Sequence, residues 1–187
     1  MTISIGVMGS AGDTGGQENK ASLAEKAHAL AAAIAERKLQ LLTGATTGII
    51  YVVGKAAHDA GTLHIGISPA SNAGEHVEKY NLPLDACDLI VFTGFGLKGR
   101  NVVLVRSCDI VLFIAGAMGS LNEFTIAHDE GKVIGCLTGT GGVADEADFL
   151  LEKFSKKTDA VVFRDDDPVK LIEACLEDFK KKASDII

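Results

Sequence analysis

Residues 109–128 read DIVLFI-AGAMGSLNE-FTIAH, and three local patterns meet within them. The apolar, β-branched run 109–114 is typical of a buried strand, and residues 124–128 fit the first turns of a helix. Two glycines in the connecting segment 115–123 let the backbone pass close to a ligand. Unpaired N–H groups and the helix dipole attract anions to a helix start. The stretch therefore predicts a strand–turn–helix unit that binds phosphate, with Glu123 one turn into the helix.

The same alternation of apolar runs and helical patterns extends along the whole chain, which is typical of stacked βα units. We expect strands at residues 3–8, 40–43, 64–68, 89–92, 109–114, 133–137 and 160–163. The predicted fold class is α/β: a single three-layer domain over residues 1–187, with a parallel Rossmann-like sheet of about seven strands. Residues 68–88 show no clean pattern, which indicates an irregular crossing or a lid-like loop.

The composition narrows the classes of function. The 187 residues carry a formal net charge of −7, whereas a groove that binds nucleic acid irrespective of sequence needs clustered Lys and Arg. We therefore expect no nucleic-acid partner. A small phosphorylated ligand is compatible with an acidic chain, because backbone amides can hold it locally.

Cysteine and histidine spacing predicts neither a disulfide framework nor a metal site. The four cysteines (Cys87, Cys108, Cys136 and Cys175) are far apart, and three lie in or beside apolar runs, which favours buried, reduced thiols. The five histidines share no spacing and are interpreted as ordinary surface or half-buried side chains. The chain begins directly with a strand and has no apolar run of about 20 residues, so we expect a cytoplasmic protein without a membrane segment.

Four predicted strands end in loops rich in glycine, serine or threonine. In a parallel sheet these loops share the carboxyl edge, where α/β proteins bind ligands at a reversal of strand order. The alternative for each loop is that a short βα turn needs glycine. The candidate ligand-binding residues are Gly9, Ser10, Gly44, Thr47, Gly48, Gly116, Ala117, Met118, Gly119 and Ser120. A fourth loop, 138–142, has the same character, and none of the loops carries a dinucleotide or P-loop fingerprint.

The segment 115–123 resembles the P-G-G-x-G-T-x-x-E motif of the LONELY GUY-type phosphoribohydrolases, long mislabelled as lysine decarboxylases. Residues 98–101, Lys-Gly-Arg-Asn, resemble the upstream arginine motif of that family. The run 99–107 is typical of the branch that includes molybdenum-cofactor carrier proteins. The resemblance implies a Rossmann-like fold, a homodimer and cleavage of the N-glycosidic bond of nucleoside 5′-monophosphates. It also makes molybdenum cofactor a possible carried ligand.

This sequence departs from the two family motifs at four positions. Ala115 stands in place of the proline and Ala117 in place of the second glycine, while Ser120 keeps the hydroxyl of the threonine. Loss of the proline frees φ at the turn. Asn101 stands where the hydrolases commonly have lysine, which removes a cation.

Arg100 and Glu123 are the candidate catalytic residues. The resemblance implies that Glu123 stabilises positive charge at the ribose C1′ or orients the attacking water. From the residues alone, Ser120–Glu123 also fits a capping box, which glutamine at 123 would preserve. Arg100 could hold phosphate or pair with Glu123, and its alternative is a solvated arginine at a helix start. Arg106, nearly two turns further on, is interpreted as structural.

Two functions from different classes follow. The chain either hydrolyses a nucleoside 5′-monophosphate, or it carries or senses a phosphorylated pterin or nucleotide without catalysis. Amino-acid decarboxylation finds no support, because the sequence lacks a lysine context for pyridoxal phosphate. The apolar run 102–105 covers more than one helix face, which predicts a symmetric dimer through that region.

Overall fold

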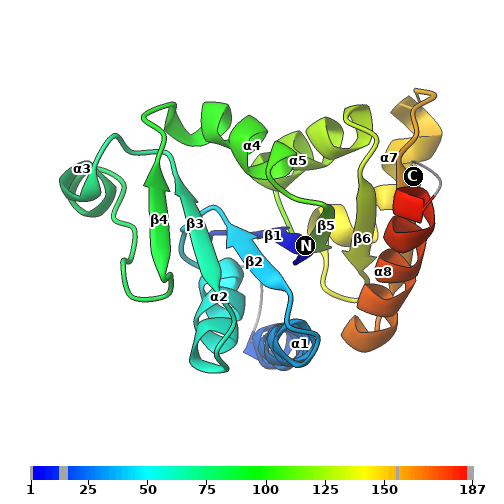
Figure 1. Ribbon diagram of the computed structural model, residues 1–187, viewed down its shortest axis with the longest axis horizontal. Helices are drawn as coiled ribbons and strands as arrows, with labels where there is room; N and C mark the ends of the chain where they lie inside the picture. Colours follow the sequence, from blue (N-terminus) through cyan, green and yellow to red (C-terminus); the bar gives the residue numbers. More distant parts are fainter. Residues whose placement is uncertain (1, 13–16, 155, 185–187) are drawn as a thin grey trace.

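A computed structural model describes residues 2–12, 17–154 and 156–184, and in it the strands form one parallel sheet with the order β4-β3-β2-β1-β5-β6-β7 (Figure 1). The strands are β1 (Ser4–Gly9), β2 (Gln40–Thr43), β3 (His64–Ser68), β4 (Leu89–Phe92), β5 (Ile110–Ile114), β6 (Val133–Leu137) and β7 (Val161–Asp165). The predicted α/β class and the three-layer Rossmann-like arrangement are confirmed.

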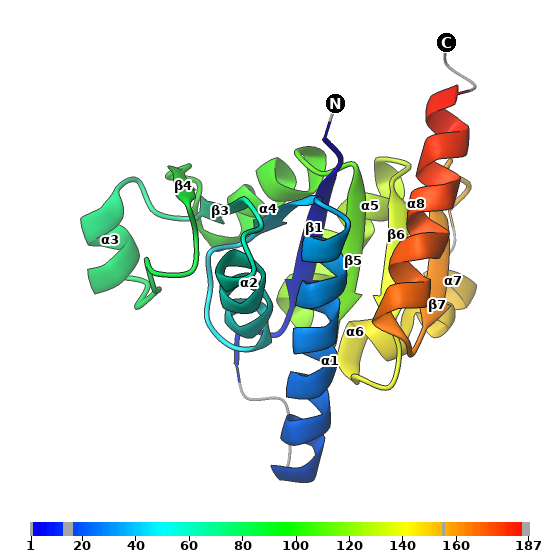
Figure 2. The ribbon, with the colours of Figure 1, turned by 60° about the horizontal axis from the view of Figure 1, so that its bottom comes forward.

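Helices cover both faces of the sheet (Figures 1 and 2). One face packs against α1 (Gln17–Glu36), α2 (Ile49–Asp59) and α8 (Pro168–Ser184). The other packs against α4 (Gly96–Arg106), α5 (Met118–Asp129), α6 (Gly142–Asp145) and α7 (Ala147–Phe154). The central strand β5 is buried along its whole length, as its unbroken apolar run predicts.

The order of the strands reverses beside β1. After the outermost strand β4, the chain returns through α4 and places β5 against the free side of β1, with Gly9 opposite Ile114. The loops that leave β1 and β5 therefore diverge to opposite sides of the sheet and leave a crevice at the carboxyl ends of the strands.

The segment 68–88 contains the short helix α3 (Ala73–Glu78), which the sequence pattern did not predict. The Asn72 side chain caps this helix by accepting a hydrogen bond of 2.9 Å from the Glu75 N–H. His76 anchors the helix to the sheet, because its Nδ1 lies 2.8 Å from the Ser68 hydroxyl. His76 and His64 are fully buried, so the expectation of surface or half-buried histidines is wrong for these two.

The four cysteines are free thiols, and three of them are buried, as expected. Burial raises the pKa of all four to about 12, so each remains a protonated thiol at neutral pH. Within the described ranges, no helix combines the length and the apolar character that crossing a membrane requires.

Candidate functional site

A cavity of about 280 Å³ lies at the crevice between β1 and β5. Its volume is close to the lower end of the range of about 300–1,000 Å³ for small-molecule sites. The walls come from the loops after β1 and β2 and from the first turns of α4 and α5. The lining residues are Val7, Met8, Gly9, Ser10, Ala11, Gly12, Gly44, Thr46, Ile50, Leu97, Lys98, Arg100, Asn101, Ala117, Gly119, Ser120 and Glu123.

The N-terminus of α5 forms one wall of the cavity. The helix begins at Met118, and its N-cap residue Ala117 has extended backbone angles and no capping side-chain hydrogen bond within the described part of the chain. The first N–H groups of an α-helix have no partner within the helix, so they can serve a ligand. This wall is therefore the uncapped helix start at which the sequence predicts a phosphate.

The capping-box interpretation of Ser120 and Glu123 is wrong. The helix starts earlier than the sequence pattern suggested, so Ser120 lies inside its first turn and Glu123 in its second. The Glu123 carboxylate does not turn back to the helix start. Its Oε1 accepts a hydrogen bond from Nη1 of Arg100 instead.

Hydrogen bonds to residues of two other loops hold the turn before α5 in place. Ala115 has a φ of +54° and Gly116 a φ of +113°. The Gly116 N–H donates to the Ser10 hydroxyl over 3.2 Å, and the Ala115 N–H donates to the Thr140 hydroxyl over 2.8 Å. Proline could not adopt the φ of Ala115, because its ring holds φ near −65°. The turn therefore uses the freedom that the loss of the motif proline provides.

Arg100 and Glu123 form a buried ion pair at the floor of the cavity. Nη1 of Arg100 lies 3.0 Å from Oε1 of Glu123, and each residue is only 6% exposed. Burial raises the pKa of Glu123 and lowers the pKa of Arg100, and the opposite charge of each partner opposes both shifts. Nε of Arg100 is buried and makes no hydrogen bond to any described residue. The guanidinium thus retains a donor that nothing in the described protein satisfies.

Two asparagines extend this pair into a network between α4 and α5. Asn101, which is 3% exposed, accepts a hydrogen bond from Nη1 of Arg100 over 2.8 Å and donates one to Asn122 over 2.9 Å. An acceptor at position 101 therefore replaces the lysine of the hydrolases. A lysine here would face a second cation, whereas Asn101 holds the guanidinium in place.

Gly44 and Lys98 complete the electrostatics of the cavity. A Cβ atom on Gly44 would overlap the Arg100 guanidinium, so the absence of a side chain lets the β2–α2 loop lie against this cation. Lys98 is exposed at the start of α4, makes no hydrogen bond or ion pair with the residues described and lowers the pKa of Glu123. Two cations against one carboxylate leave the cavity net positive, which suits an anion.

The structure places eight of the twelve predicted site residues on the cavity wall. These are Gly9, Ser10, Gly44, Arg100, Ala117, Gly119, Ser120 and Glu123. Sequence reasoning did not include Lys98 or Asn101 as ligand-facing residues. Their position beside Arg100, at the start of the same helix, is the signal that could have identified them.

The other four predicted residues lie outside the cavity lining: Thr47, Gly48, Gly116 and Met118. Thr47 donates to the carbonyl oxygen of Ala11 over 2.9 Å, and a Cβ on Gly48 would press on Ser10 and Ala11. They therefore support the β1 loop from behind. The N–H of Gly116 is used by Ser10, and the Met118 side chain is 75% exposed.

The glycine-rich loop 138–142 has a structural role, because it supports the turn before α5. Its Gly139 and Gly141 N–H groups donate to the Asp145 carboxylate over 2.8 and 2.9 Å, and Thr140 supports Ala115. The alternative that a short βα loop simply needs glycine fits here.

Arg106 pairs with Glu130 at 3.4 Å on the surface, as a structural residue would. The described residues contain no cluster of three or more histidine, cysteine or acidic side chains suited to a metal ion.

Comparison with known proteins adds a family and two similar structures. A model of the SLOG cluster4 family matches residues 2–172. The structure of a molybdenum cofactor binding protein from Rippkaea orientalis is 26% identical, covers 98% of both chains and has a TM-score of 0.71. The molybdenum cofactor carrier protein from Chlamydomonas reinhardtii is 22% identical, with 95% of this chain and 98% of that chain covered and a TM-score of 0.71, which shows the fold alone.

One curated relative also matches over part of its length. An uncharacterized protein from Archaeoglobus fulgidus is 32% identical over 104 residues, which are 56% of this chain. The match spans 63% of the length of that relative.

Proposed function

Since the chain belongs to the SLOG cluster4 family, we propose that it binds a phosphorylated, nucleotide-like small molecule in the cavity between β1 and β5. The uncapped start of α5 carries this proposal, because its residues Ala117, Gly119 and Ser120 line the same cavity as Lys98 and Arg100. The phosphate would lie on Gly119 and Ser120, and Lys98 would neutralise its charge. The rest of the ligand would extend over the Arg100–Glu123 pair.

Hydrolysis of a nucleoside 5′-monophosphate is the chemistry that we propose first. In that reaction Glu123 would stabilise the positive charge that develops at the ribose C1′, or orient the water that attacks it. Arg100 would hold the carboxylate ionised and aimed at the ligand, and its free Nε would contact the ligand. The buried Arg100–Glu123 pair inside the cavity supports this assignment.

Carriage of a molybdenum cofactor is the second candidate, and the similarity to the Rippkaea orientalis protein favours it. The donors that line the cavity suit a terminal phosphate. Side chains that could coordinate the metal are scarce there, since Glu123 is the one carboxylate among the lining residues and none of them is a thiol or an imidazole. The cargo would therefore be held by its phosphate and its pterin rings.

Two measurements separate these functions. Mass spectrometry of the ligand that co-purifies with the native protein should find either a nucleoside monophosphate or a molybdopterin. An assay of base release from a panel of nucleoside 5′-monophosphates then tests for turnover. Absence of base release from every member of the panel would exclude the hydrolase and leave the carrier. Absence of binding of both ligand classes would reject the proposed site.

Substitution of Gly119 tests where the phosphate lies. A Cβ at this position has room, since its nearest neighbour would be Nζ of Lys98 at 3.8 Å, but a leucine side chain would fill the space before the helix start. Gly119→Leu should weaken the binding of adenosine 5′-monophosphate at least about tenfold, the equivalent of one charge-assisted hydrogen bond. Isothermal titration calorimetry measures the affinity. Thr125→Leu, on an exposed position of the same helix, should leave it unchanged; equal affinities for both variants would contradict the placement.

We also propose a symmetric dimer through α4 and β4. Leu104 and Val105 of α4 are buried in the core, but Val102 is 41% exposed. Leu89 and Val91 on the edge strand β4 are 55% and 41% exposed. We propose that these exposed apolar side chains contribute to the surface that a second copy of the chain covers.

Sedimentation velocity at micromolar concentration should therefore show a dimer. Val102→Lys should shift the protein to a monomer, because a buried ammonium would be unpaired in the interface. Val169→Lys, at a 38% exposed position on α8, is the matched control and should leave the dimer intact. A monomeric unmodified protein would contradict the prediction.

A further inference from the structure

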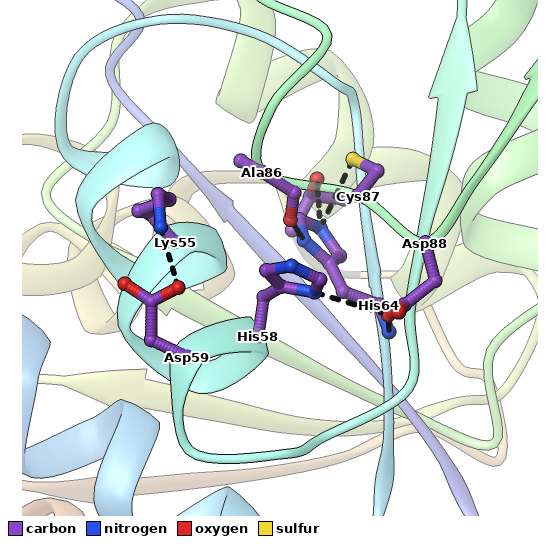
Figure 3. A network of polar contacts seen from close by, with 8 residues as sticks. Lys55, His58, Asp59, His64, Ala86, Cys87 and Asp88 are labelled. Atoms are coloured by element: carbon purple, nitrogen blue, oxygen red, sulfur yellow. Dashed lines mark hydrogen bonds and ion pairs between the residues drawn. The ribbon is translucent and has the colours of Figure 1, made fainter.

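A buried histidine lies next to the site without contributing to its lining. His64, at the start of β3, is 1% exposed, and Figure 3 shows its ring between the carbonyl group of Ala86 and the thiol of Cys87. Burial lowers the pKa of His64, although Asp88 opposes this shift. The carboxylate of Asp88 accepts the His64 backbone N–H over 2.8 Å and also contacts His58.

The hydrogen bonds of His64 define a single neutral tautomer. Nδ1 contacts the Ala86 carbonyl oxygen, which can only accept, so Nδ1 carries the proton. Nε2 is then the acceptor. The Thr43 hydroxyl, at 2.8 Å, donates to it.

Thr43 transmits this arrangement to the β2–α2 loop. While its hydroxyl donates to His64, its oxygen accepts the Ala45 N–H over 3.2 Å. Ala45 has a φ of +48°, a left-handed conformation that a residue with a side chain rarely adopts and that needs support. The preceding residue is Gly44, which lies against the guanidinium of Arg100.

We propose that His64 is a positioning residue, which fixes the Gly44–Ala45 loop through the Thr43 hydroxyl and thereby confines the Arg100 guanidinium to its orientation in the cavity. The expected effect on ligand affinity rests on the proposed function. The expected effect on the orientation of the Arg100 guanidinium does not. Neither His64 nor Thr43 lines the cavity, so both act through the loop.

The neighbouring strand β3 ends in the same arrangement of a hydroxyl, a buried histidine and a backbone N–H, and this second arrangement supplies a control. Ser68, at the end of β3, lies 2.8 Å from Nδ1 of His76 and accepts the Ala70 N–H over 3.0 Å. His76 in turn contacts the Pro83 carbonyl oxygen through Nε2 at 3.0 Å. The loop that follows β3 contributes no residue to the cavity lining. Loss of the Ser68 hydroxyl should therefore lower the stability of the protein about as much as loss of the Thr43 hydroxyl does. It should leave the orientation of the Arg100 guanidinium unchanged.

The test uses Thr43→Val, which keeps the shape of the side chain and removes the hydroxyl, with Thr43→Ser and Ser68→Ala as controls. NMR of the ¹⁵N-labelled protein without ligand reports the Arg100 Nε–H resonance, assigned by its loss in Arg100→Lys. The imidazole ¹⁵N shifts of His64 report its tautomer. Titration with adenosine 5′-monophosphate reports affinity.

We expect Nδ1–H for His64 and a shift of the Arg100 resonance in Thr43→Val that is absent in Thr43→Ser and Ser68→Ala. Affinity for the nucleotide should fall about tenfold in Thr43→Val alone. An unmoved Arg100 resonance in Thr43→Val, or an equal shift in Ser68→Ala, would overturn the positioning role. If the unmodified protein does not bind the nucleotide, the assignment of this ligand fails, while the Arg100 resonance still decides whether the contacts from His64 through the Thr43 hydroxyl position the guanidinium.

Discussion

Replacing Glu123 with glutamine is expected to lower the free energy of unfolding by about 3 kcal/mol. Glutamine can still accept a hydrogen bond from Arg100, but it leaves the guanidinium charge without a counter-ion at a position that is 6% exposed. A helix cap, in contrast, would tolerate this change. Urea denaturation measures the loss. If the protein is a hydrolase, the same variant should also reduce turnover by about 10²–10⁴-fold.

A surface pair is the control for this variant. Glu130 pairs with Arg106 at 3.4 Å in an exposed setting, so Glu130→Gln should cost less than about 1 kcal/mol. A loss in Glu123→Gln no larger than that in Glu130→Gln would contradict the expected role of burial. The double variant Arg100→Met, Glu123→Leu removes both charges, and apolar side chains often replace a buried pair without loss of stability. It should recover most of the stability while losing nucleotide binding, which would indicate that the pair is retained for function.

Gly44→Ala is the second substitution for which we expect a large effect. The added methyl group would overlap the Arg100 guanidinium, which hydrogen bonds to Glu123 and Asn101 hold in place. Overpacking of this kind costs about 1–3 kcal/mol. Displacement of Arg100 should in addition weaken binding of adenosine 5′-monophosphate more than about tenfold. Thermal unfolding and calorimetric titration measure the two effects.

Gly119→Ala provides a matched comparison in the same cavity. A methyl group at position 119 has no neighbour closer than 3.8 Å, so stability and affinity should change little. If Gly44→Ala behaves like Gly119→Ala, then the β2–α2 loop does not confine Arg100.

The strands and the general location of the site could be predicted because both depend on local patterns. Strands β2, β3, β4 and β6 have the predicted bounds, since apolar runs between turn residues define them. The cavity lies at the predicted sheet edge, because parallel topology brings the loops after β1, β2 and β5 to one side. The resemblance to a known motif then identified Arg100 and Glu123 as the candidate catalytic residues, and a pair with Glu123 was one of the two roles considered for Arg100.

The missed features depend on contacts between distant residues. The Ser-x-x-Glu pattern at 120–123 fits a helix start, yet α5 begins at Met118, because the turn at Ala115 and Gly116 has already redirected the chain. Burial of His64 depends on Thr43 and Ala86, which are 21 and 22 residues away. Periodicity carries no information about such partners. The exclusion of Thr47 and Gly48 from the cavity likewise follows from their contacts with the β1 loop.

The left-handed turn at Ala115 limits how this sequence can change. A proline ring holds φ near −65°, about 120° from the angle that Ala115 adopts. Reintroducing the motif proline would therefore require the turn to refold and to give up the hydrogen bonds that the Ala115 and Gly116 N–H groups donate to the Thr140 and Ser10 hydroxyls. Ala115→Pro alone would therefore disrupt this turn instead of restoring the motif.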